Sequence, residues 1–398
     1  MPKRAHTSLY YADDRDVYDL LEAATRNLPL AKLFDYAKTR GLFLSTQDGR
    51  ETLVEELSSL THSWEQLKSM LEATDSPDRN EKKTSKNPPT QDNLEAVERH
   101  FQNIRDERSE EWDEVYVINR HEENSMTVTV QYTEMDTRKT RLFQRRMRDI
   151  TFQVIKSGQG IKIRHEANER ANKIAADIIK KLTPPQVESA STEINLSGQR
   201  DPVVRTKFFL NLMTKMVGFR LEDVAYLDVD RIADNDAAND EASDEEKAEE
   251  KEEENDDKIP SMTAEAIEMK GVVSASLKGE GLLHSPEFIA LRDKGFFISH
   301  TVWHAIEDKD EGKRVEFQAQ FENGAEATGF KYSVRKVYEQ FKKGGFKKSH
   351  SDVNTIDMDS YESLLEKTAS EALISCTQTE SDSVIKEDAV TETTTGEG

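Results

Sequence analysis

The chain of 398 residues is acidic, with a formal net charge of -23, and is 35% hydrophobic and 33% charged. The apolar content is low for a chain that folds throughout, so we expect part of it to lie outside any core. A single cysteine excludes an intramolecular disulfide framework and a cysteine-rich zinc site. We find neither a long apolar run nor the apolar core of a signal peptide. We therefore expect a cytoplasmic protein with no membrane partner.

Two tracts carry almost all of the negative charge. Residues 234–257 contain 14 acids and 2 lysines, and residues 352–398 contain 12 acids and 2 lysines. The rest of the chain has a net charge of only -1. Both tracts have few large apolar residues and repel themselves, so we expect a disordered acidic insertion at 233–258 and a disordered acidic tail at 349–398.

The remaining composition shifts predict an α+β protein made of several blocks. The expected order is a helical module at 1–72, a linker at 73–93, an α+β domain at 94–183, a linker at 184–200 and a second α+β domain at 201–348. The two α+β domains have a similar order of helices and strands, which hints at related units.

In the first block, residues 28–60 predict two short amphipathic helices around a glycine. Pro29 fits the first turn of a helix, and Gly41 fits the position after its last turn. Between them, apolar residues recur at the spacing of one buried helical face: Leu30, Leu33, Phe34 and Ala37. Asp48 is a candidate cap for the second helix, whose apolar face would consist of Leu53, Val54, Leu57 and Leu60.

This stretch, with its "RGL", an extended segment and "GRETLVEEL", resembles the SAP-like helix–extended loop–helix family. Such modules generally bind DNA, and sometimes RNA, at the N-terminal end of the second helix, where N–H groups attract phosphate. The resemblance covers 33 residues and implies a nucleic-acid contact at Lys32, Lys38, Arg40, Gly49 and Arg50.

The second helix of this module also carries three acids, Glu51, Glu55 and Glu56. Because carboxylates repel phosphate, a helical hairpin used for packing or protein docking stays an open alternative.

The second block changes to the pattern of an antiparallel sheet with a helix. The segments "EVYVINR" and "SMTVTVQYTEMD" alternate as half-buried strands do. Residues 149–166 predict a hairpin that turns at Gly158 and Gly160, and residues 166–182 predict a helix that ends before Pro184.

The most basic part of the chain lies between these predicted strands. Six cations fall within 11 residues that contain no acid: Arg138, Lys139, Arg141, Arg145, Arg146 and Arg148. Arginine binds phosphate through its planar fork, and an aromatic side chain such as Phe143 can stack on a base. The run predicts a second nucleic-acid-binding surface. A solvated strand connection whose arginines pair with acids elsewhere is the alternative.

The third block predicts a helix at 203–218, a strand at 223–230, a helix at 285–295 and strands at 296–307, 314–323 and 328–338. Asp228 and Asp230 on the first strand, and Glu268 and Lys270 after the acidic insertion, resemble the core order of PD-(D/E)XK nucleases. In that family two acids hold a divalent metal and the lysine positions or activates water. The resemblance implies that these four residues are catalytic, with Mg²⁺ or Mn²⁺ as cofactor. Outward-facing strand charges are the alternative.

Other chemistry has weaker signals. His300 and His304 share a face of their predicted strand and would suit a metal together with Glu307, unless they are structural histidines. The sequence contains no phosphate-binding loop, dinucleotide fingerprint or nucleophile elbow.

The function we predict is nucleic-acid binding through backbone phosphates, to DNA rather than RNA, without a cofactor. We expect the protein to be an accessory component of a nucleic-acid-handling or defence assembly. A metal-dependent nuclease and a protein-binding scaffold are the two alternatives.

Overall fold

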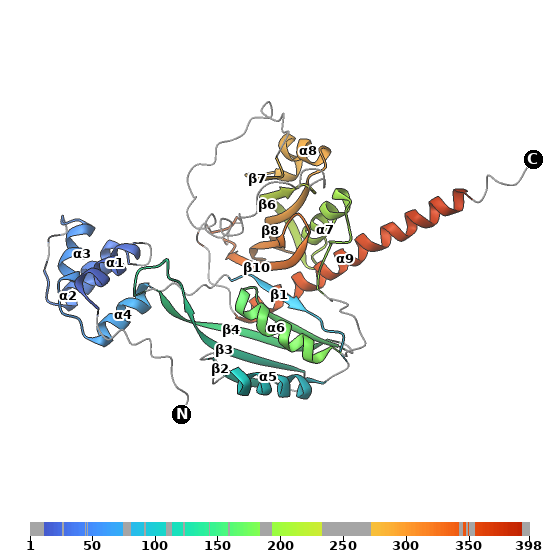
Figure 1. The fold of residues 1–398 in the computed structure, drawn as a ribbon. Helices are drawn as coiled ribbons and strands as arrows, with labels where there is room; N and C mark the ends of the chain where they lie inside the picture. Colours follow the sequence, from blue (N-terminus) through green and yellow to red (C-terminus); the bar gives the residue numbers. More distant parts are fainter. Residues whose placement is uncertain are drawn as a thin grey trace, which may run out of the picture. The chain divides into compact units, whose positions relative to one another are not determined.

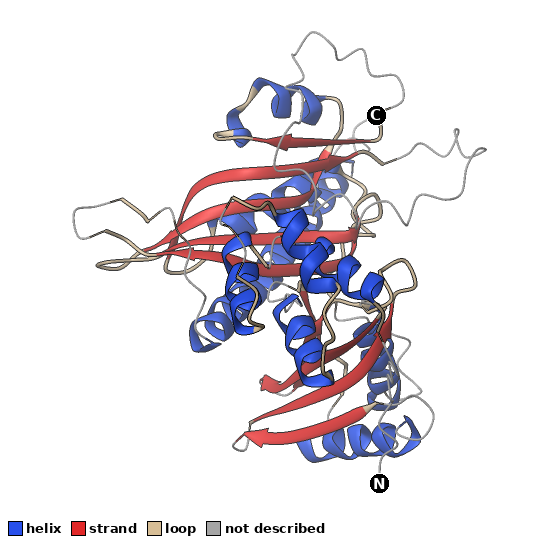
Figure 2. Ribbon diagram, turned by 90° about the vertical axis from the view of Figure 1, so that its left-hand side faces the viewer, coloured by secondary structure: helices blue, strands red, loops and turns tan. Residues whose placement is uncertain are grey.

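The computed structural model describes most of the chain (Figure 1). The described residues are 12–25, 28–43, 45, 47–74, 81–90, 93–108, 114–121, 124–142, 144–157, 160–183, 193–232, 272–341, 345–347, 349 and 355–391. In the last of these ranges the side chains are described as far as Cys376. The chain forms two compact units, Met1–Glu81 with Lys86–Ser191, and Lys82–Ser85 with Thr192–Gly398. Both combine helices with antiparallel strands, so the fold is α+β (Figure 2).

The first unit begins with four short helices, which we call the helical head. They are α1 (Asp14–Ala23), α2 (Leu30–Thr39), α3 (Arg50–Ser58) and α4 (Trp64–Thr74). A capping box between Asp13 and Asp16 starts α1, and Gly41 ends α2 with a φ of 77°. The apolar faces that the sequence indicated meet in one core, which includes Leu20, Leu33, Leu53 and Leu57.

The rest of the first unit is a four-stranded sheet with two helices. Its elements are α5 (Leu94–Arg108), β2 (Val115–His121), β3 (Ser125–Met135), β4 (Arg145–Ser157), β5 (Gly160–Glu166) and α6 (Glu169–Leu182). The strands form an antiparallel meander in the order β2-β3-β4-β5, and β4 and β5 form the predicted hairpin. Alternate strand residues such as Val128 and Phe152 pack with Phe101 of α5 and Ile174 of α6 in one core.

The second unit has a larger sheet. Its elements are α7 (Pro202–Thr214), β6 (Phe219–Asp230), β7 (Ser274–Lys278), η3 (Leu282–His284), α8 (Pro286–Asp293), β8 (Phe297–Glu307), β9 (Arg314–Asn323), β10 (Thr328–Tyr338) and α9 (Thr355–Thr391). The antiparallel order is β10-β9-β8-β6-β7, with β1 (Lys83–Lys86) beside β10. Asp201 and Ser285 cap α7 and α8, and a proline follows each cap.

The two units share one order of elements. In the first, a helix is followed by a four-stranded meander and a second helix, α5-β2-β3-β4-β5-α6. In the second, α7 is followed by the meander β6-β8-β9-β10 and then α9, with β7 and α8 inserted after the first strand. The similarity that the sequence hinted at is therefore a similarity of topology.

The tail at 349–398, which we expected to be disordered, contains α9. This expectation was wrong for residues 355–391, because averaging over an acidic segment hides a helical stripe. Tyr361, Leu365, Ala369, Ala372 and Cys376 are buried at spacings of three and four residues and pack into the core of the second unit.

The range 73–93, which we expected to be a linker, contains β1. Lys83 pairs with Tyr332 of β10, and its Nζ lies 2.9 Å from Oε1 of the buried Glu362 on α9. The predicted insertion at 233–258 lies outside the described residues. Among the helices that the structure describes, none is long and apolar enough to cross a membrane.

Candidate nucleic-acid interface

The connection between α2 and α3 is the centre of the predicted interface. Arg40 ends α2, and its Nη2 donates a hydrogen bond to the carbonyl of Thr61, just before α4. Gly49 is the N-cap of α3 and is exposed, and it supplies no side-chain capping bond. The N–H groups of the first turn of a helix have no partner within that helix, so they favour an anion, whereas the carboxylate of Glu51 in the same turn opposes one.

Lys32 and Lys38 lie on the exposed surface of α2. The Nζ of Lys38 is 3.6 Å from Oδ1 of Asp35, and both side chains are more than 60% exposed. An ion pair this exposed contributes little, so Lys38 can exchange Asp35 for another anion at small cost.

Arg50 has a different position from the one that the resemblance implied. Its Nη1 donates to the carbonyl of Leu28 at 2.5 Å, and its Nη2 donates to the carbonyl of Leu21. The guanidinium therefore ties the start of α3 to the end of α1 and the start of α2. It holds the helices of the head together rather than facing a ligand.

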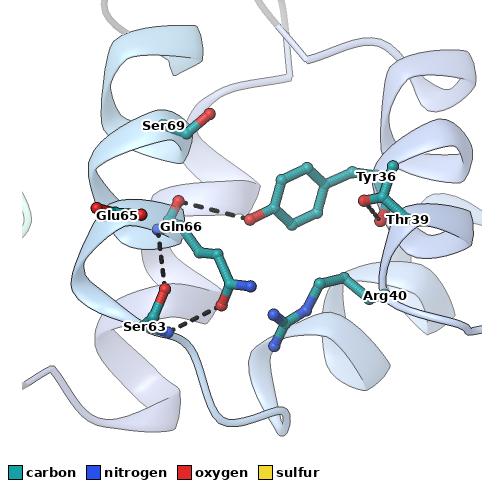
Figure 3. Close-up of a pocket in the computed structure, with 7 residues that line it drawn as sticks. All are labelled: Tyr36, Thr39, Arg40, Ser63, Glu65, Gln66 and Ser69. Atoms are coloured by element: carbon teal, nitrogen blue, oxygen red, sulfur yellow. Dashed lines mark hydrogen bonds between the residues drawn. The ribbon is translucent and has the colours of Figure 1, made fainter.

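A polar groove of about 320 Å³ lies between the end of α2 and the start of α4 (Figure 3). Its lining residues are Tyr36, Thr39, Arg40, Ser63, Glu65, Gln66 and Ser69. The close-up shows the Tyr36 ring and the Arg40 guanidinium reaching from α2 toward Ser63 and Gln66. Ser63 and Gln66 cap α4 reciprocally, at 2.9 and 3.3 Å, so the start of α4 is already satisfied.

The basic run between β3 and β4 lies beside acids. Arg138 and Lys139 pair with Asp136 at 3.4 and 3.8 Å, and Arg148 pairs with Glu134 at 2.8 Å and with Glu81 at 3.3 Å. The backbone N–H of Arg138 and the nearby positive charges hold the pKa of the Asp136 carboxyl below its ordinary value. The side chains of Arg145 and Arg146, and Phe143, lie outside the described part of the chain.

This run contacts the helical head. Nη1 of Arg141 lies 3.0 Å from Oδ2 of Asp16 in α1, and the adjacent Leu142 is buried in the core of the head. The structure therefore brings parts of the two predicted nucleic-acid-binding sets into one unit. It also gives the described cations of the run the acidic partners that the alternative interpretation required.

Of the four predicted nuclease residues, the structure describes two. Asp228 and Asp230 lie on β6, and Glu268 and Lys270 lie outside the described residues. The Asp228 carboxylate accepts hydrogen bonds from Tyr226 Oη at 2.7 Å, from Ser276 Oγ and from His300 Nδ1 at 2.8 Å. Burial acts to raise its pKa, but these donors outweigh burial and hold the pKa below the ordinary value.

Asp230 shows the opposite effect. Burial raises the pKa of its carboxyl, the charge of Asp228 adds to the rise, and a hydrogen bond from Ser299 opposes it. Two carboxyls on one strand thus have pKa values moved in opposite directions.

His300 is held on both ring nitrogens. Gln318 donates from Nε2 to His300 Nε2 at 2.8 Å, and its Oε1 accepts from Ser333 at 3.3 Å. This amide orientation assigns the proton of His300 to Nδ1, which donates to Asp228. With its one acceptor nitrogen occupied, His300 has no lone pair for a metal.

The other two predicted metal ligands lie apart. His304 Nε2 is 3.1 Å from Glu316, and Glu307 accepts a 2.8 Å bond from Tyr361. Within the described ranges, no group of three or more histidine, cysteine or acidic residues is arranged to hold a metal ion.

Sequence reasoning missed two exposed aromatic side chains of the head. Phe43, in the α2–α3 connection, is 86% exposed, and Trp64, the first residue of α4, is 55% exposed. The sequence did indicate the exposure of Phe43 by its position, because Phe43 follows Gly41 and so lies outside the apolar helical face.

Comparisons with known proteins find no match, neither among family models, nor among curated proteins, nor among solved structures.

Proposed function

We propose that the protein binds nucleic acid and that the helical head contacts the phosphate backbone. The observation that carries this proposal is the α2–α3 connection. Residues 36–47 contain two cations, Lys38 and Arg40, and no acid. Asp48, which accepts a hydrogen bond from the backbone N–H of Ser45, then precedes Gly49, the N-cap of α3. Cations in the chain segment that leads to a helix N-terminus suit phosphate, which needs both charge and N–H donors.

The basic run after β3 supports the same proposal as a secondary surface. Its described cations have carboxylate partners, so a phosphate would have to replace those partners. Arg138, whose side chain is 70% exposed, would do so at the lowest cost. The preference for DNA over RNA rests on the SAP-like resemblance alone.

The test is a binding titration of the full chain with labelled single- and double-stranded DNA and RNA, in EDTA across a salt series. Binding to phosphates weakens with salt in proportion to the number of phosphates neutralised. The double variant K38A/R40A should bind more weakly, and its slope of log affinity against log salt should fall by about 2. The control K309A/R292A removes two paired surface cations of the second unit and should change nothing.

A head variant that binds as the parent does would overturn the proposal, provided that its unfolding curve shows an intact head. The same reactions test the nuclease hypothesis when Mg²⁺ or Mn²⁺ replaces EDTA. Metal-dependent cleavage that disappears in K270A would favour the nuclease.

A further inference from the structure

We propose that the helical head binds unpaired bases, which stack on Phe43 and Trp64, so that its ligand is single-stranded nucleic acid. This inference rests on the proposed function and names its substrate class. The first observation is the solvent exposure of two aromatic side chains of the head. Among the phenylalanine and tryptophan side chains that the structure describes, three are exposed, and two of these, Phe43 and Trp64, lie on the head.

Isolated exposed apolar side chains are common, but these two lie in the two chain segments that a hydrogen bond of Arg40 joins. Phe43 follows Arg40 by three residues, and Trp64 follows Thr61, the acceptor of the Arg40 hydrogen bond, by three residues. Three residues span at most about 11 Å. The Phe43 Cα therefore lies within about 11 Å of the Arg40 Cα, and the Trp64 Cα lies within about 11 Å of the Cα of Thr61, whose carbonyl accepts the Arg40 hydrogen bond.

Charge favours a nucleic-acid strand at this place. Lys38 and Arg40 precede Phe43, and the next acid after it is Asp48. The groove beside Arg40 also contains Glu65, which repels a phosphate but can accept the amino group of a neutral base. This distribution suits a backbone near Lys38 and Arg40 with bases directed to the two aromatic side chains, which lie outside the lining of the groove.

Stacking decides between single and double strands. Every base has a π-face, so an exposed aromatic ring binds any unpaired base whatever the sequence. In a duplex those faces are covered by neighbouring base pairs. Phe43 and Trp64 can therefore add affinity only for a strand whose bases are unpaired.

The experiment measures fluorescence anisotropy of the full chain with one labelled DNA sequence, as a single strand and as a duplex, in EDTA. The parent should prefer the single strand. F43A and W64A should each weaken single-strand binding by about tenfold and leave duplex binding unchanged, so the preference shrinks. F43Y and W64F keep an aromatic ring and should retain most of the preference for the single strand.

The matched control is F341A, which removes the exposed phenylalanine of the second unit and should have no effect. Trp64 gives a second readout: its fluorescence should be quenched by the single strand, and this quenching should be absent in W64F. That readout keeps the test valid if an alanine variant fails to fold.

The outcomes separate the two proposals. Equal binding of both DNA forms, with F43A and W64A unaffected, would overturn stacking and leave phosphate binding in place. Absence of binding to either form would overturn both, and would leave the aromatic pair as a docking site for another protein.

Discussion

His165 shows how one buried side chain makes stability depend on pH. It lies on β5 with no exposed surface, its ring is 5.4 Å from that of Phe152, and Nδ1 donates to the carbonyl of Glu166. Nε2 is buried without a partner. Burial lowers the pKa of His165 from 6.5 to about 4, because a charged imidazole would lose its hydration there.

The direction of the pH dependence of stability follows from which state, folded or unfolded, binds the proton of His165 more readily. Between pH 6.5 and 4 the unfolded chain takes up a proton on this residue more readily than the folded chain does, so stability is lost as the pH falls through that window. We expect His165 to contribute a loss of roughly 3 kcal/mol by pH 4. Urea unfolding at several pH values measures it. H165Q should have a shallower pH dependence than the parent and than H121Q, a variant of an exposed histidine; equal slopes would contradict the assignment.

At the same scale, Arg50 shows why a basic residue cannot be assigned to a ligand from its position in a motif. The sequence places Arg50 directly after the helix N-cap, where a phosphate contact is expected. The carbonyls that it binds belong to Leu21 and Leu28, 29 and 22 residues earlier, and the sequence does not reveal that proximity.

At the scale of elements, periodicity predicts those elements that bury a face. Alternation located β8, β9 and β10 within a few residues, and the three- and four-residue spacing located α2 and α6. It missed β1, whose sequence "KTSK" is short and polar and carries no alternation of hydrophobicity. That strand depends on β10 and on an ion pair with Glu362, 279 residues away.

Helix α9 yields a prediction that distinguishes a packed helix from an acidic tail. Leu365 is 1% exposed within the core of the second unit, whereas Ile374, on the same helix, is 53% exposed. We expect L365A to lower the free energy of unfolding by about 3 kcal/mol through lost burial and a residual cavity. I374A is the control and should change it by less than about 0.5 kcal/mol. Equal effects of the two substitutions in denaturant unfolding would mean that α9 does not pack as described.

At the scale of the whole molecule, the negative charge opposes the proposed function. The 24 residues 234–257 carry a net charge of -12, about half of the -23 of the chain. A field of this sign slows the approach of a polyanion and is screened by salt. Replacing the acids of this tract with asparagine and glutamine should therefore raise the association rate with DNA at low salt, and the gain should vanish at high salt. Stopped-flow fluorescence measures the association rate at low and at high salt. An unchanged rate at low salt would show that this tract does not affect the interface.

The repeated order of helix, four-stranded meander and helix is also a property of the whole molecule. Each unit packs its meander against helices in one core, α5 and α6 in the first unit and α7, α8 and α9 in the second, which is a stable way to cover an antiparallel sheet. The second unit differs by β7 and α8, and by β1 from far earlier in the chain.

The sequence by itself determined the α+β class, most helices and strands, and the position of the charge, because periodicity and composition are properties of short windows. Only the tertiary structure decided which charges meet. Arg141 pairs with Asp16, 125 residues away, and Asp228 with His300, 72 residues away. It also decided that Phe43 stays exposed while Leu142 is buried. Such contacts depend on how distant segments are brought together by topology, and no local pattern contains that information.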